Sequence, residues 1–383
     1  MTERHIARCA AAFALAALAF GASAATLTLG IVQRADDERL DARRVALAYP
    51  GHPGGPLHEA VTLAVSESRF ELDHAGLQVR LEVRDVRSAE EAGAQLRQLE
   101  KAGAGGAVLD LPAAWIAVAA FATGLPVLNA GESADAPRQQ GCRPNLFHTL
   151  PTERMRADAI AQALLARRWT RVLLLHGAAD ARRLGAVEGA LKRHGLKTVA
   201  TRAFKASGDP RERDLANPLL LTGPGVGGEY DAVWVVDGDG EFARGLPYRT
   251  ALPRPVVGDG GLSALAWAPH YERHGAPQLA GRFRRHAGRE MTSHDWAAWL
   301  ATKAVLQAAL EHSTPGHAAF ALDGFKGVRL GFRPWDRQLR QPMLLSDGQG
   351  VVATAPLDGV LHPRGTLDTL GADAPERLCR ALP

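Results

Sequence analysis

The stretch NLFHTLPTERMRADAIAQALLARRWTRVLLLHG, residues 145–177, decides the fold of this chain. Thr152 follows Pro151 and is a good N-cap for a helix that runs to about residue 169. The apolar run RVLLLHG, residues 171–177, then predicts a buried strand. A helix of this length beside a buried strand is the repeating unit of a parallel α/β sheet, and the same unit recurs on both sides of this stretch.

The residues before this stretch alternate between strands and helices. Ser88 and Glu91 form a predicted capping box, after which apolar residues recur every three or four positions. Pro or Gly separates most of the elements. The predicted strands span residues 26–33, 79–86, 106–111 and 125–130, and the predicted helices span 57–69, 89–99 and 114–123.

The alternation continues after residue 177. Leu184, Val187 and Leu191 mark the inner face of a helix that Gly195 ends. Strands are predicted over residues 197–204, 232–236 and 255–258. Strands alternating with helices imply parallel sheets with right-handed crossovers, so we expect an α/β fold of two Rossmann-like, doubly wound lobes.

The last part of the chain follows a different pattern. The segments GVRLGF, QPMLLS and GVVATAP, from residue 327 on, are separated by turn residues, as is typical of antiparallel β structure. The helix predicted over residues 294–311 is apolar nearly all round, which indicates burial. We expect lobe 1 to comprise residues 26–148 and 256–326, and lobe 2 with the tail to comprise residues 149–255 and 327–383.

The first 25 residues have the composition of a secretory signal peptide. Arg4 and Arg8 precede an uncharged run, and the small residues at 21–25 suit a signal peptidase. The apolar run is shorter than the ~20 residues of a membrane span. We therefore expect an exported, periplasmic protein without membrane insertion.

Cleavage of this segment would remove Cys9 and leave Cys142 and Cys379. In an oxidising compartment this pair predicts a disulfide that holds the C-terminal tail to the body, and two unpaired thiols are the alternative. Neither cysteine lies in a C-x-x-C motif or near a histidine at ligand spacing, so we expect no metal there.

Charge and motifs argue against other classes of protein. The chain carries 45 basic and 41 acidic side chains, and no basic run is interleaved with aromatic residues, so we expect no nucleic-acid partner. Gly223, Gly225 and Gly228 match G-x-G-x-x-G but precede a predicted strand instead of following one. No nucleophile elbow, P-loop or H-E-x-x-H motif occurs. We expect no enzyme and no cofactor, with a hydrolase as the least favoured alternative.

Three segments resemble the type I periplasmic substrate-binding proteins of ABC importers, in the leucine/isoleucine/valine-binding branch. Residues 145–177 and PVVGDGG, residues 255–261, resemble two lobe crossings of that family, and FKGVRLGFRPWDRQLRQPMLL, residues 325–345, resembles its terminal β segment. The resemblance implies a monomer of two lobes joined by three crossings, with a small-molecule solute between the lobes and ABC permease subunits as partners.

A narrower resemblance concerns two segments of the second half. GDPRERDLANPLLLTGPG, residues 208–225, and YDAVWVVDGDGEF, residues 230–242, resemble the sub-branch encoded beside quinoprotein (PQQ-dependent) alcohol oxidation systems. This resemblance implies a role linked to alcohol catabolism and names no ligand.

The loops at the carboxyl ends of the parallel strands are expected to line the cleft. Amino-acid-binding relatives carry a serine-rich turn after the third strand, where this chain has DLPAAW, residues 110–115, with no hydroxyl. An α-amino acid is therefore not the favoured ligand, and an amino-acid or amide receptor is the alternative. The predicted ligand-binding residues are Trp115, Glu132, Ser133, Arg182, Asp237, Asp239 and Asp259.

Two of these predictions have alternatives. Trp115 could stack on a ligand, but a Trp at the start of an apolar helix more often belongs to the core. Asp237, Asp239 and Glu241 form an acidic turn that could hold a cation, which makes a metal- or redox-cofactor-binding protein a second alternative, or they are a solvated loop end. We expect Asp239→Ala to abolish ligand-induced closure and to leave the fold intact.

Overall fold

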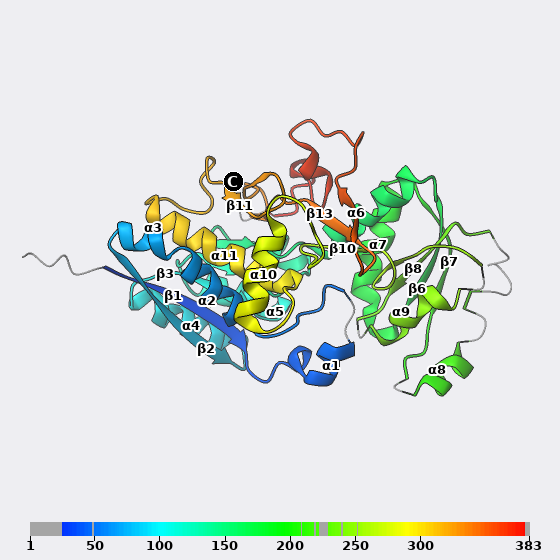
Figure 1. Ribbon diagram of the computed structural model, residues 1–383, viewed down its shortest axis with the longest axis horizontal. Helices are drawn as coiled ribbons and strands as arrows, with labels where there is room; N and C mark the ends of the chain where they lie inside the picture. Colours follow the sequence, from blue (N-terminus) through cyan, green and yellow to red (C-terminus); the bar gives the residue numbers. More distant parts are fainter. Residues whose placement is uncertain are drawn as a thin grey trace, which may run out of the picture.

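The computed structural model describes residues 25–47, 50–207, 209–217, 220–221, 229–238, 240–250 and 252–379. The predicted signal peptide lies outside the described residues, apart from Ala25. The described chain forms two lobes along the long axis of the molecule, with the C-terminal segment at their junction (Figure 1). Each lobe is built on its own parallel sheet, which confirms the predicted α/β fold class. None of the described helices is long and apolar enough to span a bilayer.

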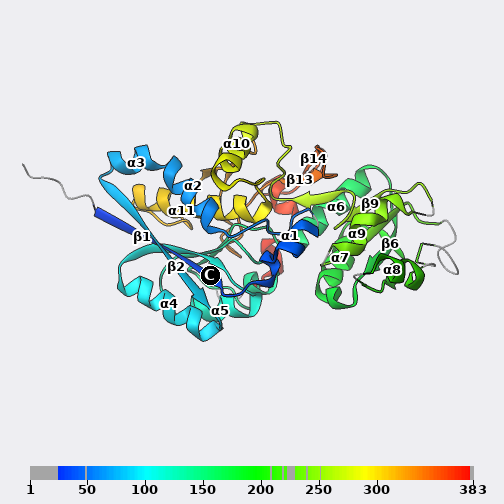
Figure 2. The ribbon, with the colours of Figure 1, turned by 60° about the horizontal axis from the view of Figure 1, so that its bottom comes forward.

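Lobe 1 contains a five-stranded parallel sheet in the order β2-β1-β3-β4-β5. Helices α4 and α5 cover one face and α2 and α11 cover the other (Figures 1 and 2). In β1, Ile31 packs under α2 and α11 while Val32 packs under α4, so both faces of the strand are apolar. The strands are β1 (Ala25–Arg34), β2 (Leu77–Val86), β3 (Ala104–Asp110), β4 (Val127–Asn129) and β5 (Leu146–His148). The helices are α1 (Ala42–Leu47), α2 (His58–Glu67), α3 (Arg69–His74), α4 (Ala89–Lys101), α5 (Ala113–Phe121), α10 (Ala276–Ala287) and α11 (Ser293–Leu310).

One helix cap and one helix boundary in lobe 1 differ from the predicted ones. Ser88 caps α4 by accepting a hydrogen bond of 3.1 Å from the Glu91 N–H, but the Glu91 carboxylate accepts from the N–H of Arg87 instead of Ser88. The helix predicted over residues 57–69 is divided at Ser68 into α2 and α3. The Ser68 hydroxyl accepts a hydrogen bond of 2.8 Å from Lys303 of α11, so a partner distant in sequence lies at this break.

Lobe 2 contains a four-stranded parallel sheet in the order β7-β6-β8-β9. Thr152 caps α6 as predicted, because its hydroxyl accepts a hydrogen bond of 3.0 Å from the Met155 N–H. Gly195, at a φ of +68°, follows the end of α7. The strands are β6 (Arg171–His176), β7 (Lys197–Ala203), β8 (Ala232–Val236) and β9 (Val256–Gly258), and the helices are α6 (Glu153–Ala166), α7 (Ala181–Arg193), α8 (Pro210–Ala216) and α9 (Glu241–Gly245).

Short antiparallel strands join the lobes. A sheet of β10 (Ser263–Leu265), β13 (Met343–Ser346) and β14 (Val351–Ala355) lies at the junction, and β11 (Leu322–Asp323) pairs with β12 (Arg329–Leu330). In β10, Ala264 packs into the core of lobe 2 and Leu265 into that of lobe 1.

Two segments of the chain belong to a different lobe from the one that the expected boundaries assign to them. Strand β9, expected at the start of the returning part of lobe 1, pairs with β8 and extends the sheet of lobe 2. Leu330 and Leu339, expected in lobe 2, pack in the core of lobe 1. The physical reason is that β9 satisfies the hydrogen-bonding edge of the lobe 2 sheet beside β8, and that Leu330 and Leu339 bury apolar side chains in the core of lobe 1.

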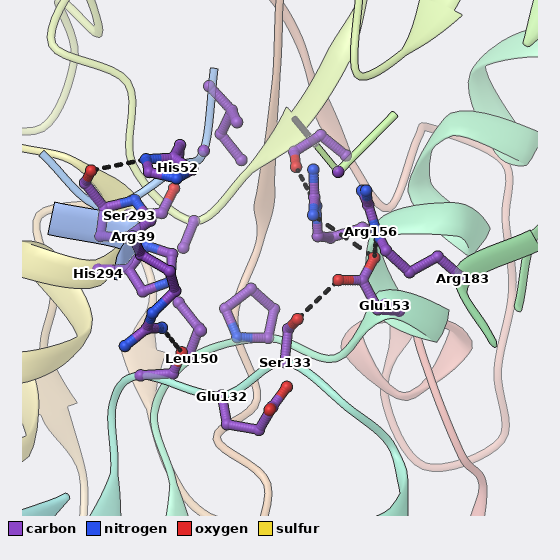
Figure 3. Close-up of a pocket in the computed structure, with 18 of the residues that line it drawn as sticks. Arg39, His52, Glu132, Ser133, Leu150, Glu153, Arg156, Arg183, Ser293 and His294 are labelled. Carbon is purple, nitrogen blue, oxygen red and sulfur yellow. Dashed lines mark hydrogen bonds and ion pairs between the residues drawn. The ribbon is translucent and has the colours of Figure 1, made fainter. Parts of the chain in front are cut away.

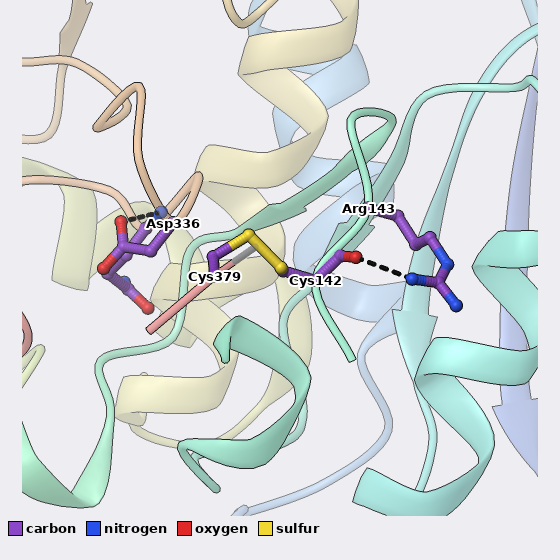
Figure 4. Close-up of a disulfide and its surroundings, with 5 residues drawn as sticks. Cys142, Arg143, Asp336 and Cys379 are labelled. Carbon is purple, nitrogen blue, oxygen red and sulfur yellow. Dashed lines mark hydrogen bonds between the residues drawn. A yellow bond between two sulfur atoms is a disulfide. The ribbon is translucent and has the colours of Figure 1, made fainter. Parts of the chain in front are cut away.

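A disulfide joins Cys142, in the loop between β4 and β5, to Cys379 of the tail, with a Cα–Cα distance of 5.8 Å (Figure 4). This is the pair that the sequence predicts. The tail also docks on lobe 2, because Arg154 of α6 donates two hydrogen bonds, of 2.7 and 2.8 Å, to Glu376. The C-terminal tail is therefore attached to both lobes.

Candidate ligand-binding site

A cavity of about 270 Å³ lies between the two lobes and is lined from both (Figure 3). Arg39, His52, Ser293 and His294 lie on one side of it, and Glu153, Arg156 and Arg183 face them from lobe 2. Glu132 and Ser133 complete the wall between these two sides. The apolar part of the lining includes Pro53, Leu150, Pro151 and Leu265.

The loop after β4 is fixed by its own side chains. The Asn129 side chain accepts a hydrogen bond of 3.0 Å from the Glu132 N–H and donates one of 2.8 Å to the Glu132 carbonyl. The Glu132 carboxylate in turn accepts from the N–H groups of Ala113 and Ala134, at 3.0 and 2.7 Å. Glu132 therefore reaches the cavity with both carboxylate oxygens already hydrogen-bonded.

Glu153, the first residue of α6, is the centre of a charged network. Its carboxylate accepts a hydrogen bond of 2.6 Å from Ser133 and lies 3.5 Å from the guanidinium groups of Arg156 and Arg183. Burial opposes ionisation of Glu153, but the two arginines outweigh it and lower the pKa of Glu153 to about 2. Arg183 continues the network to Asp259, at 2.7 Å.

On the lobe 1 side, Arg39 is held by two carboxylates. Its guanidinium donates to Asp110 at 2.6 Å and to Asp37 at 2.9 Å. Burial raises the pKa of Asp110 even though Arg39 acts against this shift. The ion pair between Arg39 and Asp110 therefore occupies the carboxyl end of β3.

Two histidines add neutral polar groups to the wall of lobe 1. Burial lowers the pKa of His52, and its Nδ1 donates a hydrogen bond of 2.8 Å to the Pro53 carbonyl. Burial, reinforced by Arg39 and His52, lowers the pKa of His294 to about 3. Burial therefore favours the neutral form of both imidazoles.

Two contacts cross the cleft away from the network of Glu153. The Arg182 guanidinium of α7 lies 4.0 Å from the Glu132 carboxylate. Arg244 of α9 donates a hydrogen bond of 3.0 Å to the Ala46 carbonyl of α1. These two contacts join the lobes, and an opening motion would separate them.

Solved structures share this two-lobe arrangement. A branched-chain amino acid ABC transporter periplasmic ligand-binding protein from Burkholderia xenovorans LB400 has a TM-score of 0.69 at 16% identity, covering 93% of this chain and 99% of that chain. This chain has the type I periplasmic binding protein fold. No protein-family model matches the sequence, and no curated protein sequence does so either.

Two other structures of the type I periplasmic binding protein fold carry ligand information. A leucine-, isoleucine-, valine-, threonine- and alanine-binding protein from Brucella ovis, in a closed conformation, has a TM-score of 0.63 at 13% identity, covering 84% of this chain and 89% of that chain. An ABC transporter solute-binding protein from Rhodopseudomonas palustris BisB5, in complex with 3,4-dihydroxybenzoic acid, has a TM-score of 0.62 at 12% identity, covering 84% of this chain and 93% of that chain.

Three of the predicted ligand-binding residues line the cavity of this fold: Glu132, Ser133 and Arg182. Asp259 lies behind the wall, where it accepts from Arg183 and from the Asp237 N–H. Asp239 lies outside the described residues.

The other two predicted residues have structural partners instead. Trp115 packs against the core beneath α4 and α5 and is not among the residues that line the cavity. Its position agrees with the alternative that this Trp belongs to the core. The Asp237 carboxylate accepts hydrogen bonds of 2.9 Å from the N–H groups of Phe242 and Ala243, so it holds the first turn of α9. Among the described residues, no cluster of His, Cys, Asp or Glu side chains suits a metal ion.

Sequence reasoning missed Arg39, His52, Glu153 and His294 as lining residues. Arg39 and His52 lie in the irregular segments around α1, where no periodic pattern indicates their direction. His294 had a usable signal, because the sequence Thr292-Ser293-His294-Asp295 has the form of a capping box. That pattern places His294 at a helix N-terminus.

Proposed function

We propose that this protein is the periplasmic solute-binding component of an ABC importer, and that it captures a small organic molecule in the cavity between its lobes. The observation that carries the proposal is a cavity lined by polar side chains of both lobes, in a molecule whose lobes also contact each other through Arg182 and Arg244. A ligand that contacts both walls stabilises the closed arrangement by its difference in affinity for the two states. Permease subunits would then recognise the closed form.

The cavity favours a small solute with both polar and apolar parts. Its volume of about 270 Å³ is at the lower end of the range for ligand pockets. Pro53, Leu150 and Leu265 supply apolar surface beside the charged network. The similar solved structure in complex with 3,4-dihydroxybenzoic acid supports a ligand of this size.

We further propose that transport by this protein belongs to quinoprotein alcohol catabolism, so that the solute is an alcohol or a product of its oxidation. The sequence resemblance of residues 208–225 and 230–242 supports this proposal, and so does the loss of the serine-rich turn that amino-acid-binding relatives carry. An amino-acid or amide receptor is the competing function that the experiment must separate.

Thermal unfolding and small-angle scattering in the presence of matched solutes test the proposal. We expect a compound present at 100 times its dissociation constant to stabilise the protein by ~2.7 kcal/mol and to reduce its radius of gyration. The panel contains short alcohols, their carboxylic acids, isoleucine, isoleucinamide and divalent cations. Stabilisation by isoleucine alone would support the amino-acid receptor, and stabilisation by cations alone would support a metal-binding protein.

A pair of variants shows whether binding occurs in this cavity. Arg182 is 63% exposed at the cavity, so Arg182→Trp is expected to fill the space without disturbing the core. Arg285 is exposed on α10, away from the cavity, and Arg285→Trp is the matched control. We expect the first variant to lose ligand stabilisation and the second to keep it. If no compound changed the radius of gyration or the melting temperature of the wild-type protein, the proposed function would be refuted.

A further inference from the structure

The N-terminus of α11 forms part of the cavity wall of lobe 1. Ser293 and His294 are the first two residues of this 18-residue helix, and both line the cavity. The cap residue Thr292 accepts from the Asp295 N–H. Within the described part of the chain, no group accepts a hydrogen bond from the main-chain N–H of Ser293 or of His294. Two donors and the positive end of a long helix therefore stand at the cavity.

The imidazole of His294 is a second, independent feature of the same place. Its side chain is nine-tenths buried, and its Nδ1 is enclosed without any hydrogen-bond partner among the described residues. In the main chain, a buried N–H without an acceptor is rarer than a buried C=O without a donor, and we apply the same preference to this ring. The proton of the neutral ring therefore belongs on Nε2, which leaves an N–H donor for a group in the cavity.

The carboxylates around the cavity already have hydrogen-bond or ion-pair partners within the protein. Both oxygens of Glu132 accept main-chain hydrogen bonds, and Glu153 is shared between Ser133 and two arginines. Asp110, at the end of β3, is paired with Arg39. The cavity thus offers unoccupied donors at α11, and its acidic groups are already engaged.

We propose that the solute is a small carboxylate without an amino group, and that its carboxylate binds at the N-terminus of α11, against the N–H groups of Ser293 and His294 and the imidazole of His294. This inference rests on the proposed function and names the ligand class of the same cavity. Helix N-termini bind anions because their N–H groups and the helix dipole both favour negative charge. The turn after β3 takes no part, since Arg39 and Asp110 fill it.

Two sets of probes, each with one carbon skeleton and three different polar groups, test the ligand class. The first is butyrate, butyramide and butylamine, and the second is benzoate, benzamide and benzylamine, with inorganic phosphate as an anion of different shape. Titration calorimetry with the full protein is expected to detect at least one carboxylate and to find its amide and amine at least about tenfold weaker, because a hydrogen bond to a charged group is worth about that factor or more.

Three variants locate the carboxylate. His294→Leu removes the donor, and we expect it to weaken carboxylate binding by about tenfold or more while the unliganded protein melts at the same or a higher temperature, because a buried atom without a partner is removed. His294→Gln keeps an N–H donor and is expected to retain most of the affinity. His286, exposed on α10, gives the matched control His286→Leu. In the wild-type protein, ¹⁵N spectra are expected to show the proton on Nε2, with the Nε2 signal shifting when the carboxylate is added.

The outcomes separate this inference from the proposed function. Equal carboxylate affinity in wild type and His294→Leu would overturn the site at α11 and leave solute binding intact. An amide, an amine or phosphate that binds as well as the carboxylates would overturn the ligand class. Failure of every carboxylate, while a neutral or cationic compound closes the lobes, would overturn the inference alone. If no compound bound, both this inference and the proposed function would be overturned.

Discussion

Ser133, in the loop after β4 of lobe 1, donates a hydrogen bond of 2.6 Å to Glu153, the first residue of α6 in lobe 2. The Glu153 N–H returns a hydrogen bond of 3.0 Å to the Ser133 carbonyl. The two residues line the cavity and lie at the crossing between the lobes. The same pair of residues therefore forms part of the cavity wall and holds the loop after β4 to the first turn of α6.

Glu153→Gln is expected to destabilise the protein in a pH-dependent way. The folded-state pKa of Glu153 is about 2, below the ordinary value of 4.5, so its charge contributes stability above pH 4.5 that is lost as the pH falls toward 2. We expect the variant to lose roughly 3 kcal/mol at neutral pH, and this deficit to narrow steadily below pH 4.5. Urea unfolding at neutral pH and at several acidic pH values measures it.

Glu188→Gln is the control for this prediction, because Glu188 is exposed on α7 of the same lobe. It is expected to follow the wild-type stability at every pH within about 0.5 kcal/mol. A deficit of Glu153→Gln that stays constant from neutral to acidic pH would contradict the role of the Glu153 charge.

Arg39→Met is expected to lower the free energy of unfolding, because it leaves the buried Asp110 carboxylate without this partner. The change removes the partner of Asp110 at 2.6 Å, and we expect a loss of about 2 kcal/mol, less than for a fully buried pair because Arg39 is 34% exposed. The pKa of Asp110, already raised by burial, would rise further, so the deficit is expected to shrink as the pH falls. Denaturant unfolding at two pH values measures both effects.

The double variant Arg39→Met/Asp110→Asn tests whether the stability lost in Arg39→Met comes from the unpaired charge of Asp110. Removing the unpaired carboxylate is expected to restore part of the lost stability, since the amide carries no charge to bury. Arg97→Met, at an exposed position of α4, is the control for loss of an arginine. Additive losses in the double variant would show that the two side chains do not interact energetically.

The sequence predicted those parts of the fold that depend on neighbouring residues. Thr152 and Gly195 mark helix ends by local chemistry, and both act as predicted. The break at Ser68 and the ion pair of Arg39 depend on Lys303 and Asp110, which lie 235 and 71 residues away, and no local pattern contains them. Strand β5, only three residues long, carries too few residues for a periodic signal.

The candidate site could be predicted only in part for the same reason. Glu132, Ser133 and Arg182 line the cavity because they follow strands whose carboxyl ends meet there, which is a property of the fold class. Trp115 and Asp237 also follow strands, yet packing and helix capping hold them away from the cavity. The position at the end of a strand therefore brings a residue near the cleft, and its local hydrogen-bond partners decide whether it faces the ligand.

Arg182→Gln is expected to weaken binding of a carboxylate without changing the fold. The Arg182 side chain is 63% exposed and 4.0 Å from Glu132, and such a surface pair contributes about 0.5 kcal/mol or less to stability. Its charge at the cavity mouth attracts anions, so we expect a few-fold loss of affinity at low salt that disappears near about 0.5 M salt. Calorimetric titration of benzoate and butyrate at both salt concentrations measures it, with Arg285→Gln on α10 as the control.

Removal of the disulfide is expected to loosen the C-terminal tail and lower the stability of the whole protein. The bond between Cys142 and Cys379 closes a loop across a sequence separation of 237 residues, and cross-links of long loops contribute about 2–5 kcal/mol. In Cys142→Ala/Cys379→Ala the tail would keep its non-covalent contacts, among them the hydrogen bonds from Arg154 to Glu376, and lose its covalent attachment to lobe 1. We expect faster hydrogen exchange in residues 366–376 and a lower urea midpoint. Reductant should lower the midpoint of the wild type and leave the double variant unchanged, whereas an equal response of both proteins would show that the bond contributes nothing to stability.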